Sequence, residues 1–480
     1  MKRCLALAAA ALLAACAAGP DYVRPKVEAP AQYKELQGWR AAAPSETAPK
    51  GEWWTMFQDP ELDALIARID ISNQNIRLAE ARLRQARAVA DQARAGLFPA
   101  LNANASATRS KSPSLPNAPS FANGAVNNFS ASLNASWEPD FWGGVRRSVE
   151  EGEANTQASA ADLETARLSA RATLAQDYFA LRVADATRKT LEETVAAYAR
   201  TLELTRNRYA AGVAARVDVV QAEVQLKSAQ AQRIDVGVQR AQLEHAIALQ
   251  LGVAPAGFAL APAPLAARMP AIPVGLPSEL LERRPDVAAA ERRTAAANAG
   301  IGVAQAAFFP AVTLTAASGS RTTSLADLFS APTHFWSLGA ALAQPLFDAG
   351  LRSAQKAQAV AAYDAQVATY RQTVLTGFQE VEDNLAALRI LEEEAALQED
   401  VVRAARESVE LTTNQYRAGV VSYLNVITAQ ATLLANERAA ADILGRRLTA
   451  SVALIKALGG GWTAREGLTA VKNPASAAGR

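Results

Sequence analysis

The chain has 480 residues, with 49 lysines and arginines against 47 aspartates and glutamates. This balance provides no clustered positive charge of the kind that nucleic acids bind, so it argues against a nucleic-acid partner. Aromatic residues make up only 6% of the chain, and alanine is frequent throughout. Many small and few large side chains favour closely packed helices over one thick core.

The first residues have the pattern of an export signal. Lys2 and Arg3 precede an apolar run, Leu5 to Ala15, that is too short to span a bilayer as a helix. We therefore expect residues 1–15 to be a signal peptide. The string LAAC at its end resembles a bacterial lipobox, which implies that Cys16 becomes the acylated first residue. The alternative is a short signal with a chance cysteine.

The residue after the lipobox bears on the destination of the chain. Ala17, rather than an aspartate, implies export to the outer membrane, where the lipid on Cys16 would include palmitate. The other cysteine, Cys4, leaves with the signal, so the mature chain can form neither a disulfide nor a thiolate metal site. We expect no metal and no cofactor besides the covalent lipid.

Two stretches far apart in the chain are nearly alike. NRYAAGVAARVDVVQAE begins at Asn207 and NQYRAGVVSYLNVITAQ at Asn414, and their register holds without a gap. LFPALNANAS likewise pairs with FFPAVTLTAA, and EPDFWGGVRR with QPLFDAGLRS, in the same order. Three ordered matches predict a tandem duplication. The expected segments are an N-terminal segment 16–60, a first copy 61–255, a Pro-rich linker 256–277, a second copy 278–462 and a tail 463–480.

Each copy begins with a helix followed by two alternating stretches. The helix is expected from Leu62 to Leu97 in the first copy and from an Asp286 N-cap to Phe308 in the second, each ended by the proline of an FP pair. The alternating stretches predict strands at about 100–110 and 128–138, and at about 311–320 and 334–346.

A very long helix then follows in each copy. A seven-residue apolar period over Arg146–Tyr209 and Leu351–Tyr416 predicts coiled-coil helices about 100 Å long at ~1.5 Å per residue. The repeated Tyr–Gly sequence is then the tight turn that sends each long helix back as a shorter one of about 35 residues, near 50 Å.

The alternating stretches have the length of tilted strands that cross a bilayer. Four strands cannot close a barrel, and an open edge in lipid leaves backbone groups unpaired. If the strands insert, three copies giving about 12 strands would form a channel. The alternative is a soluble hairpin that caps a helical rod.

Several strings carry a family resemblance. GPDYVRPKVEAP, WWTMFQDPELDALIARI, LPSELLERRPDVAAAE, YRAGVVSYLNV and ALGGGW, which cover nearly everything from Cys16 to Trp462, resemble the TolC-like outer-membrane factor family. The lipobox is similar to that of its lipoprotein branch, the NodT/OprM-like group that serves resistance-nodulation-division efflux systems.

The resemblance implies a mixed α and β membrane protein. Three copies would form a 12-stranded outer-membrane β-barrel, with four strands from each protomer, continued by an α-helical coiled-coil tunnel across the periplasm. An inner-membrane pump and a periplasmic adaptor would open this passive duct, through which drugs or other small toxic molecules would leave the cell. Residues 16–60 would be an extended, lipid-anchored strap, which the helix-disfavouring prolines suit.

In this family the Tyr–Gly turns close the periplasmic end of the tunnel. The residues that match the motif are Tyr209, Gly212, Tyr416 and Gly419. Glycine at these points supplies a left-handed backbone that other residues resist. The alternative is that both tyrosines only pack between helices.

The charges of the expected gate depart from the family pattern. Arg417 and Asp218 are the charged candidates, whereas relatives commonly carry aspartate at the positions of Asn425 or Thr428 and form an acidic ring. We therefore expect a less acidic aperture that tyrosine and arginine hydrogen bonds hold closed.

An enzyme is poorly supported. His245 and His334 are the only histidines, and the chain lacks the GxxxxGK, HExxH and GxSxG motifs. Two other functions stay open: a duct for type I protein secretion, and a non-conducting, lipid-anchored coiled-coil scaffold of the envelope.

Overall fold

The computed structural model describes residues 18–35, 52–111, 125–265, 268–272 and 283–461, so Cys16 and the expected signal lie outside the described residues. The chain divides into two compact units. The first comprises residues 1–26, 83–159 and 290–370, and the second comprises residues 27–82, 160–289 and 371–480. We describe each unit separately. Among the described helices, none combines the length and the apolar character that a membrane crossing needs.

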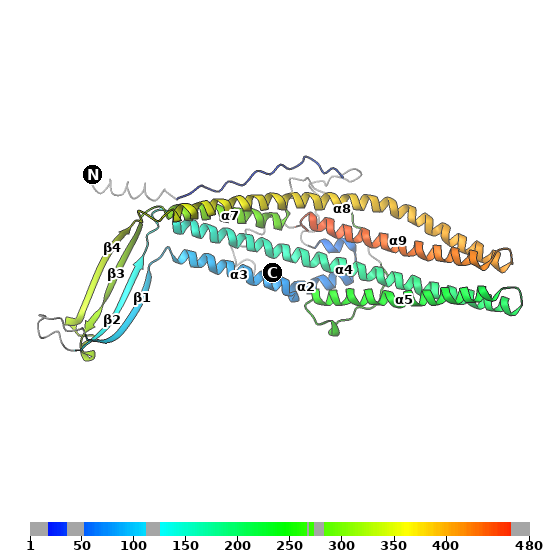
Figure 1. The fold of residues 1–480 in the computed structure, drawn as a ribbon, viewed down its shortest axis with the longest axis horizontal. Coiled ribbons are helices and arrows are strands. Elements are labelled where there is room, and N and C mark those ends of the chain that lie inside the picture. Colours follow the sequence, from blue (N-terminus) through cyan, green and yellow to red (C-terminus); the bar gives the residue numbers. More distant parts are fainter. Residues whose placement is uncertain (1–17, 36–51, 112–124, 266–267, 273–282, 462–480) are drawn as a thin grey trace. The chain divides into compact units, whose positions relative to one another are not determined.

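The helices and strands recur in the same order in the two halves of the chain (Figure 1). The corresponding helices have equal lengths: 22 residues in α3 and α7, 67 in α4 and α8, and 35 in α5 and α9. The bounds are α2 Pro60–Ser72, α3 Gln74–Ala95, β1 Ala100–Ser110, β2 Val126–Trp137, α4 Gly144–Ala210, α5 Arg216–Gln250, α7 Pro285–Ala306, β3 Ala311–Thr322, β4 His334–Ala343, α8 Leu351–Arg417 and α9 Tyr423–Ala457.

The first unit contains one antiparallel sheet with the strand order β1-β2-β3-β4 (Figure 1). The sheet joins the two halves of the chain, because β2 pairs with β3 from Phe129↔Thr322 to Trp137↔Leu314. The strand expected at about 334–346 ends earlier, at Ala343, because Pro345 has no N–H to donate to a ladder. Among the described residues, no strand lies beside the outer edges of β1 and β4.

The register gives this sheet two chemically different faces. Leu133 lies opposite Ala103 and Ser318, and Ser318 lies opposite Trp336, so these side chains share one face. Ser106 and Ser130 share the other face, where their hydroxyls are 2.9 Å apart. The apolar face carries Leu101, Ala103, Ala105, Ala107, Phe129, Ala131, Leu133, Ala135, Trp137, Val312, Leu314, Ala316, Trp336, Leu338, Ala340 and Leu342, and toward the end far from α7 it also carries the polar residues Arg109, Asn127, Ser318, Ser320, Thr322 and His334. The polar face carries Asn102, Asn104, Ser106, Thr108, Asn128, Ser130, Ser132, Asn134, Ser136, Thr313, Thr315, Arg321 and Ser337.

Small side chains let the helices of the first unit approach closely. Ala154 packs with Ala295 and Ala296, and Tyr22 from the N-terminal segment lies against them. The Tyr22 hydroxyl donates to Glu291 at 2.7 Å. Burial, together with this carboxylate, raises the pKa of Tyr22. The tyrosine therefore stays protonated and anchors the extended segment to α7.

From the sequence, the N-terminal segment is expected to be extended throughout 16–60. Residues 18–35 contain neither helix nor strand, with bends at 31–32 and a turn at 34–35. Residues Trp53–Phe57 form a 3-10 turn, which corrects that expectation. Phe57 is fully buried, and its ring lies 4.9 Å from that of Phe179 on α4. Burying three large aromatic side chains, including Trp53 and Trp54, outweighs the extended preference of the prolines before them.

The first expected helix, Leu62 to Leu97, is two helices. Asn73 has extended backbone angles, φ −65° and ψ 123°, between α2 and α3. Its side-chain oxygen accepts hydrogen bonds from the N–H groups of Asn75 and Ile76, at 2.9 and 3.1 Å. Asn73 therefore starts α3 as an N-cap residue. The second expected helix also starts differently: Pro285 begins α7, and Asp286 lies inside its first turn.

Asn73 also anchors the end of α5, and Arg284, the corresponding residue of the second copy, anchors the end of α9. The Asn73 amide donates to the Gln250 carbonyl at 2.7 Å. The register that pairs Leu97 with Phe308 pairs Asn73 with Arg284, whose guanidinium donates to the Ala457 carbonyl at 3.2 Å. Gln250 and Ala457 are the last residues of their helices, where carbonyls have no partner within the helix.

The two anchors differ in charge. Arg284 is nearly buried and pairs with Asp286 and Glu380, each at 2.6 Å. The register of the long helices, which pairs Tyr209 with Tyr416, gives the first copy a neutral threonine, Thr173, where the second has Glu380. One returning helix is therefore held by a neutral amide and the other by a cation shared between two carboxylates.

We predict that Arg284→Ala lowers the stability of the protein by about 1 to 3 kcal/mol, because it leaves the Ala457 carbonyl and two carboxylates without their donor. Thermal unfolding of the detergent-solubilised protein, followed by circular dichroism, measures the change. The matched control is Arg403→Ala, which removes an exposed pair with Asp400 that contributes little. Equal midpoints for the two variants would contradict the anchoring role.

Candidate functional site

The two Tyr–Gly turns have the same backbone geometry. Gly212 and Gly419 adopt φ values of 74° and 80°, which confirms the expected left-handed conformation. After α4, Gly212 N–H donates to the Tyr209 carbonyl and Val213 N–H to that of Arg208, both at 2.9 Å. The same pair of bonds recurs after α8. This is the Schellman arrangement, in which glycine ends a helix and pairs its last carbonyls.

The tyrosines that precede the two glycines have different surroundings. Tyr416 is 3% exposed, whereas Tyr209 is 47% exposed. Tyr416 therefore packs between helices and Tyr209 does not, although their sequence contexts match. The difference arises from tertiary packing, since both turns have the same local hydrogen bonds.

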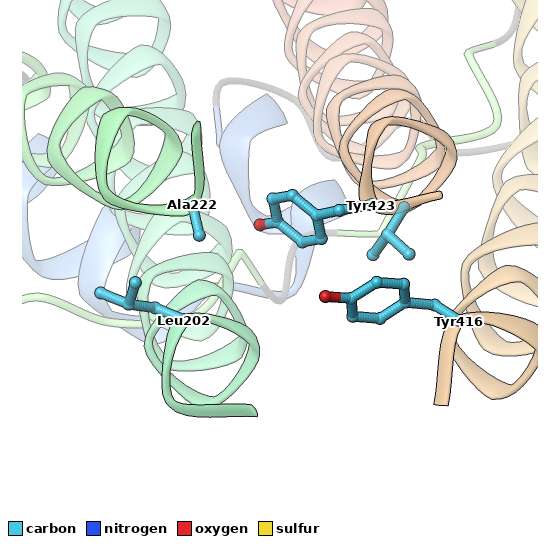
Figure 2. Close-up of a cluster of buried hydrophobic side chains, with 5 residues drawn as sticks. Leu202, Ala222, Tyr416 and Tyr423 are labelled. Atoms are coloured by element: carbon cyan, nitrogen blue, oxygen red, sulfur yellow. The ribbon is translucent and has the colours of Figure 1, made fainter. Parts of the chain in front are cut away.

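A buried cluster joins the ends of the two helical hairpins near their turns (Figure 2). Its members are Leu202 on α4, Ala222 on α5, Tyr416 on α8, and Tyr423 and Val426 on α9. Figure 2 shows both tyrosine rings pointing from α8 and α9 toward Leu202 and Ala222. The two rings lie 5.5 Å apart at an angle of 53°. We call these five residues the tip cluster.

The hydroxyl of Tyr423 in the tip cluster stays protonated. Burial raises the pKa of Tyr423, and the neighbouring Tyr416, Tyr198 and Asp218 raise it further. The Tyr416 hydroxyl lies 3.5 Å from Thr205 Oγ1, a long contact. The rings therefore act mainly through packing.

Arg208, on the last turn of α4, is the main polar link between the hairpins at this level. Its guanidinium lies 4.8 Å from the centre of the Tyr416 ring. It also donates to the carbonyl of Arg417, the last residue of α8, at 3.0 Å. A cation at this place is favourable, because the carbonyls at a helix C-terminus carry partial negative charge.

The sequence analysis named Arg417 as a charged candidate but did not identify Arg208, whose guanidinium reaches the other hairpin. Arg417 is exposed and bonds to Asn414, one turn back on its own helix, at 3.2 Å. The available signal was the string NRYAAG, where Arg208 stands immediately before the tyrosine and the second copy has Gln415. The sequence of neither turn by itself predicts that Arg208 contacts the other hairpin.

The remaining expected residues are not brought into the tip cluster. Asn425 and Thr428 are exposed on the first turns of α9, and Thr428 Oγ1 donates to the Leu424 carbonyl of its own helix. Asp218 is partly exposed in the first turn of α5. Within the described ranges, no three or more His, Cys, Asp or Glu side chains are grouped to hold a metal ion.

An amphipathic sheet, with long helical hairpins whose ends pack on each other, defines a channel-type membrane protein. A family model described as outer membrane efflux protein matches residues 65–253 and 276–460. The chain therefore belongs to the outer membrane efflux protein family. It is an efflux channel of the outer membrane that extends into the periplasm, and it is not an enzyme.

Individual proteins resemble the chain over almost its whole length. It is 35% identical over 475 residues to the pyoverdine export outer membrane protein OpmQ of Pseudomonas aeruginosa, covering 98% of this chain and 99% of that protein. It is 33% identical over 470 residues to the toluene efflux pump outer membrane protein TtgC of Pseudomonas putida, covering 97% of each. The outer-membrane channel OprN has a similar structure, with a TM-score of 0.86 at 31% identity, over 93% of this chain and 100% of that one.

We predict that Arg208→Gln loosens the contact between the hairpins. Losing the hydrogen bond to the Arg417 carbonyl and the contact with the Tyr416 ring removes about 1 to 2 kcal/mol per copy. For each chain, this corresponds to a roughly 5- to 30-fold rise in the population of separated hairpin ends. Conductance recordings in planar lipid bilayers measure the resulting rise in channel opening.

Arg206→Gln is the matched control, because Arg206 pairs with Glu223 of α5 within one hairpin. It should leave opening unchanged, and equal opening by the two variants would contradict the role of Arg208.

Tyr416→Phe should also behave like the unmodified chain, because only the long hydroxyl contact is lost. If Tyr416→Ala leaves opening unchanged, Tyr416 only packs and takes no part in a gate.

Proposed function

We propose that the chain is the exit duct of a tripartite efflux system and that three copies form one channel. The observation that carries this proposal is the sheet of the first unit. It has one polar and one apolar face, and no described strand pairs with its outer edges. Large apolar side chains on the apolar face are exposed in the single chain, including Leu101, Trp336 and Leu338 at 69%, 70% and 76%.

The physics of a strand edge in lipid favours three copies. Backbone groups within the hydrocarbon must be hydrogen-bonded, so a four-stranded sheet with two free edges cannot insert alone. Three sheets joined edge to edge give a closed barrel of about 12 strands, wide enough for a lumen. The apolar face would then contact lipid and the polar face would line the lumen.

An exposed apolar stripe on α5 supports the same assembly. Val217, Val224 and Val238 recur at multiples of seven residues, and each is more than half exposed in the single chain. Val220 and Ile234 also recur at a multiple of seven along this helix. Such a repeat favours another helix packed along it, as in a coiled coil. We infer that a neighbouring copy covers this stripe in the trimer.

Partners and cargo follow from the relatives and from the sequence resemblance. One relative is named for pyoverdine export and another for toluene efflux, so similar chains serve different small molecules. We propose that this chain conducts drugs or other small toxic molecules passively, and that a periplasmic adaptor and a resistance-nodulation-division pump supply them. In this scheme the tip cluster and Arg208 close the periplasmic end.

We predict that deleting the gene raises the accumulation of dyes and drugs in cells, and that restoring it reverses the effect. Uptake assays in a strain stripped of other outer-membrane factors measure this. If accumulation does not change in that strain, the proposal of small-molecule efflux is wrong. Protein secretion or a scaffold role then becomes the favoured function.

Two neighbouring residues of β4 sharpen this experiment. Leu338 lies on the apolar face and Ser337 on the polar face. A positive charge facing lipid costs about 2 to 4 kcal/mol at the bilayer midplane, whereas lumen positions tolerate it. The Leu338→Arg gene should therefore fail to restore efflux, and the Ser337→Arg gene should restore it. The opposite result would reverse the proposed assignment of the faces.

We further propose that Cys16 carries the lipid anchor. Metabolic labelling with radioactive palmitate should label the unmodified chain and leave the Cys16→Ala chain unlabelled, because no other cysteine remains after signal removal. Equal labelling would contradict the assignment. Efflux should largely persist in this variant if the barrel itself holds the protein in the membrane.

A further inference from the structure

One residue of the polar face carries a formal charge. Among the described residues of the four strands, the side chains that share the face of Ser106 and Ser130 are neutral except for Arg321. Arg321 lies directly opposite Ser130, at the second-last position of β3. It is therefore at the end of the sheet that is far from α7 and near the β3–β4 connection.

The Arg321 side chain packs against an aromatic ring, and no described carboxylate pairs with its charge. Its guanidinium lies 5.7 Å from the centre of the Phe335 ring on β4. Phe335 pairs with Gly319, so the ring and the guanidinium lie on the same face, one diagonal step apart. Within the part of the chain that the structure describes, no carboxylate forms an ion pair with Arg321. The cation is exposed and available to a solute.

The surroundings of Arg321 add positive charge. Arg109 and Lys111 lie at the same end of the sheet, where β1 ends. The sequence 112–124 between β1 and β2 contains no charged residue, and the β3–β4 connection contains one acid, Asp327. Arg109, Lys111 and Arg321 against Asp327 leave a net charge of +2 per chain at this end.

We propose that Arg321 makes the distal mouth of the channel selective for anions, so that carboxylate-bearing and other negatively charged solutes pass more readily than cations. This inference rests on the proposed trimer. Three copies place three guanidinium groups around one lumen, and a ring of like charges concentrates counter-ions in a low-dielectric passage. A guanidinium also binds carboxylates in a bidentate manner, which favours such solutes over chloride.

Arg109 provides a matched control at the same end of the sheet. It alternates with Thr108 and shares the face of Ala107, so it lies on the apolar side of β1. In the trimer this side faces lipid headgroups and not the lumen. Arg109→Gln therefore removes one positive charge, as Arg321→Gln does, but from the apolar face and not from the polar face.

The experiment uses the purified full-length chain in planar bilayers of zwitterionic lipid under a tenfold gradient of potassium chloride. The reversal potential gives the anion-to-cation permeability ratio. Arg321→Gln should lower this ratio several-fold, whereas Arg321→Lys and Arg109→Gln should keep it. The difference should shrink at high salt, because the screening length falls to ~3 Å at 1 M.

Each outcome decides between defined alternatives. If Arg321→Gln conducts with an unchanged ratio, the selectivity proposal is overturned while the duct stands. If Arg109→Gln changes the ratio as strongly, the effect is a general surface potential and not a lumen residue. If neither the unmodified chain nor the Arg208→Gln chain, which lacks the proposed closing contact, conducts, the proposed duct fails and the role of Arg321 fails with it.

Discussion

A backbone hydrogen-bonding group cannot be left unpaired in hydrocarbon, and this constraint organises the first unit. Its four strands pair completely among themselves, yet the outer edges of β1 and β4 have no described partner. The alternating side chains along these strands place most of the Asn, Ser and Thr residues on one face and the large apolar residues mainly on the other, with Ser318, Ser320 and Thr322 as exceptions on the apolar face. In a membrane, a sheet of this kind needs partners for its two outer edges, and this need underlies the proposed trimer.

The second unit holds two long hairpins together through two kinds of contact. Polar anchors at the ends of α5 and α9 are nearly buried, with Asn73 at 2% and Arg284 at 6% exposure. At the turns, by contrast, the link is a small apolar cluster with one arginine. Under the proposed function, strong contacts far from the turns and weaker contacts beside them would place the lowest local stability at the proposed gate.

Local chemistry made much of this architecture predictable. Gly212 and Gly419 follow from the need for a left-handed residue after each long helix, and the seven-residue period predicts helices of the observed length. The strands follow from alternation of polar and apolar residues, which is strict in β1 and β2 and weaker in β3 and β4. The sequence did not predict the break at Asn73. The Asn73 side chain donates to the carbonyl of Gln250, a residue that is far away in the sequence. The sequence did not predict the contact of Arg208 for the same reason, since its acceptor, the Arg417 carbonyl, lies on the other hairpin.

The sequence by itself determined the order of the elements, the duplication and the two faces of the sheet, because these depend on short periods and on turn residues that act locally. Only the tertiary structure decided which of two matching tyrosines is buried and which arginine joins the hairpins. It also decided that one returning helix is anchored by a neutral amide and the other by a charged group. Those choices depend on contacts between residues that are far apart in the sequence, which local periods and turn residues do not specify.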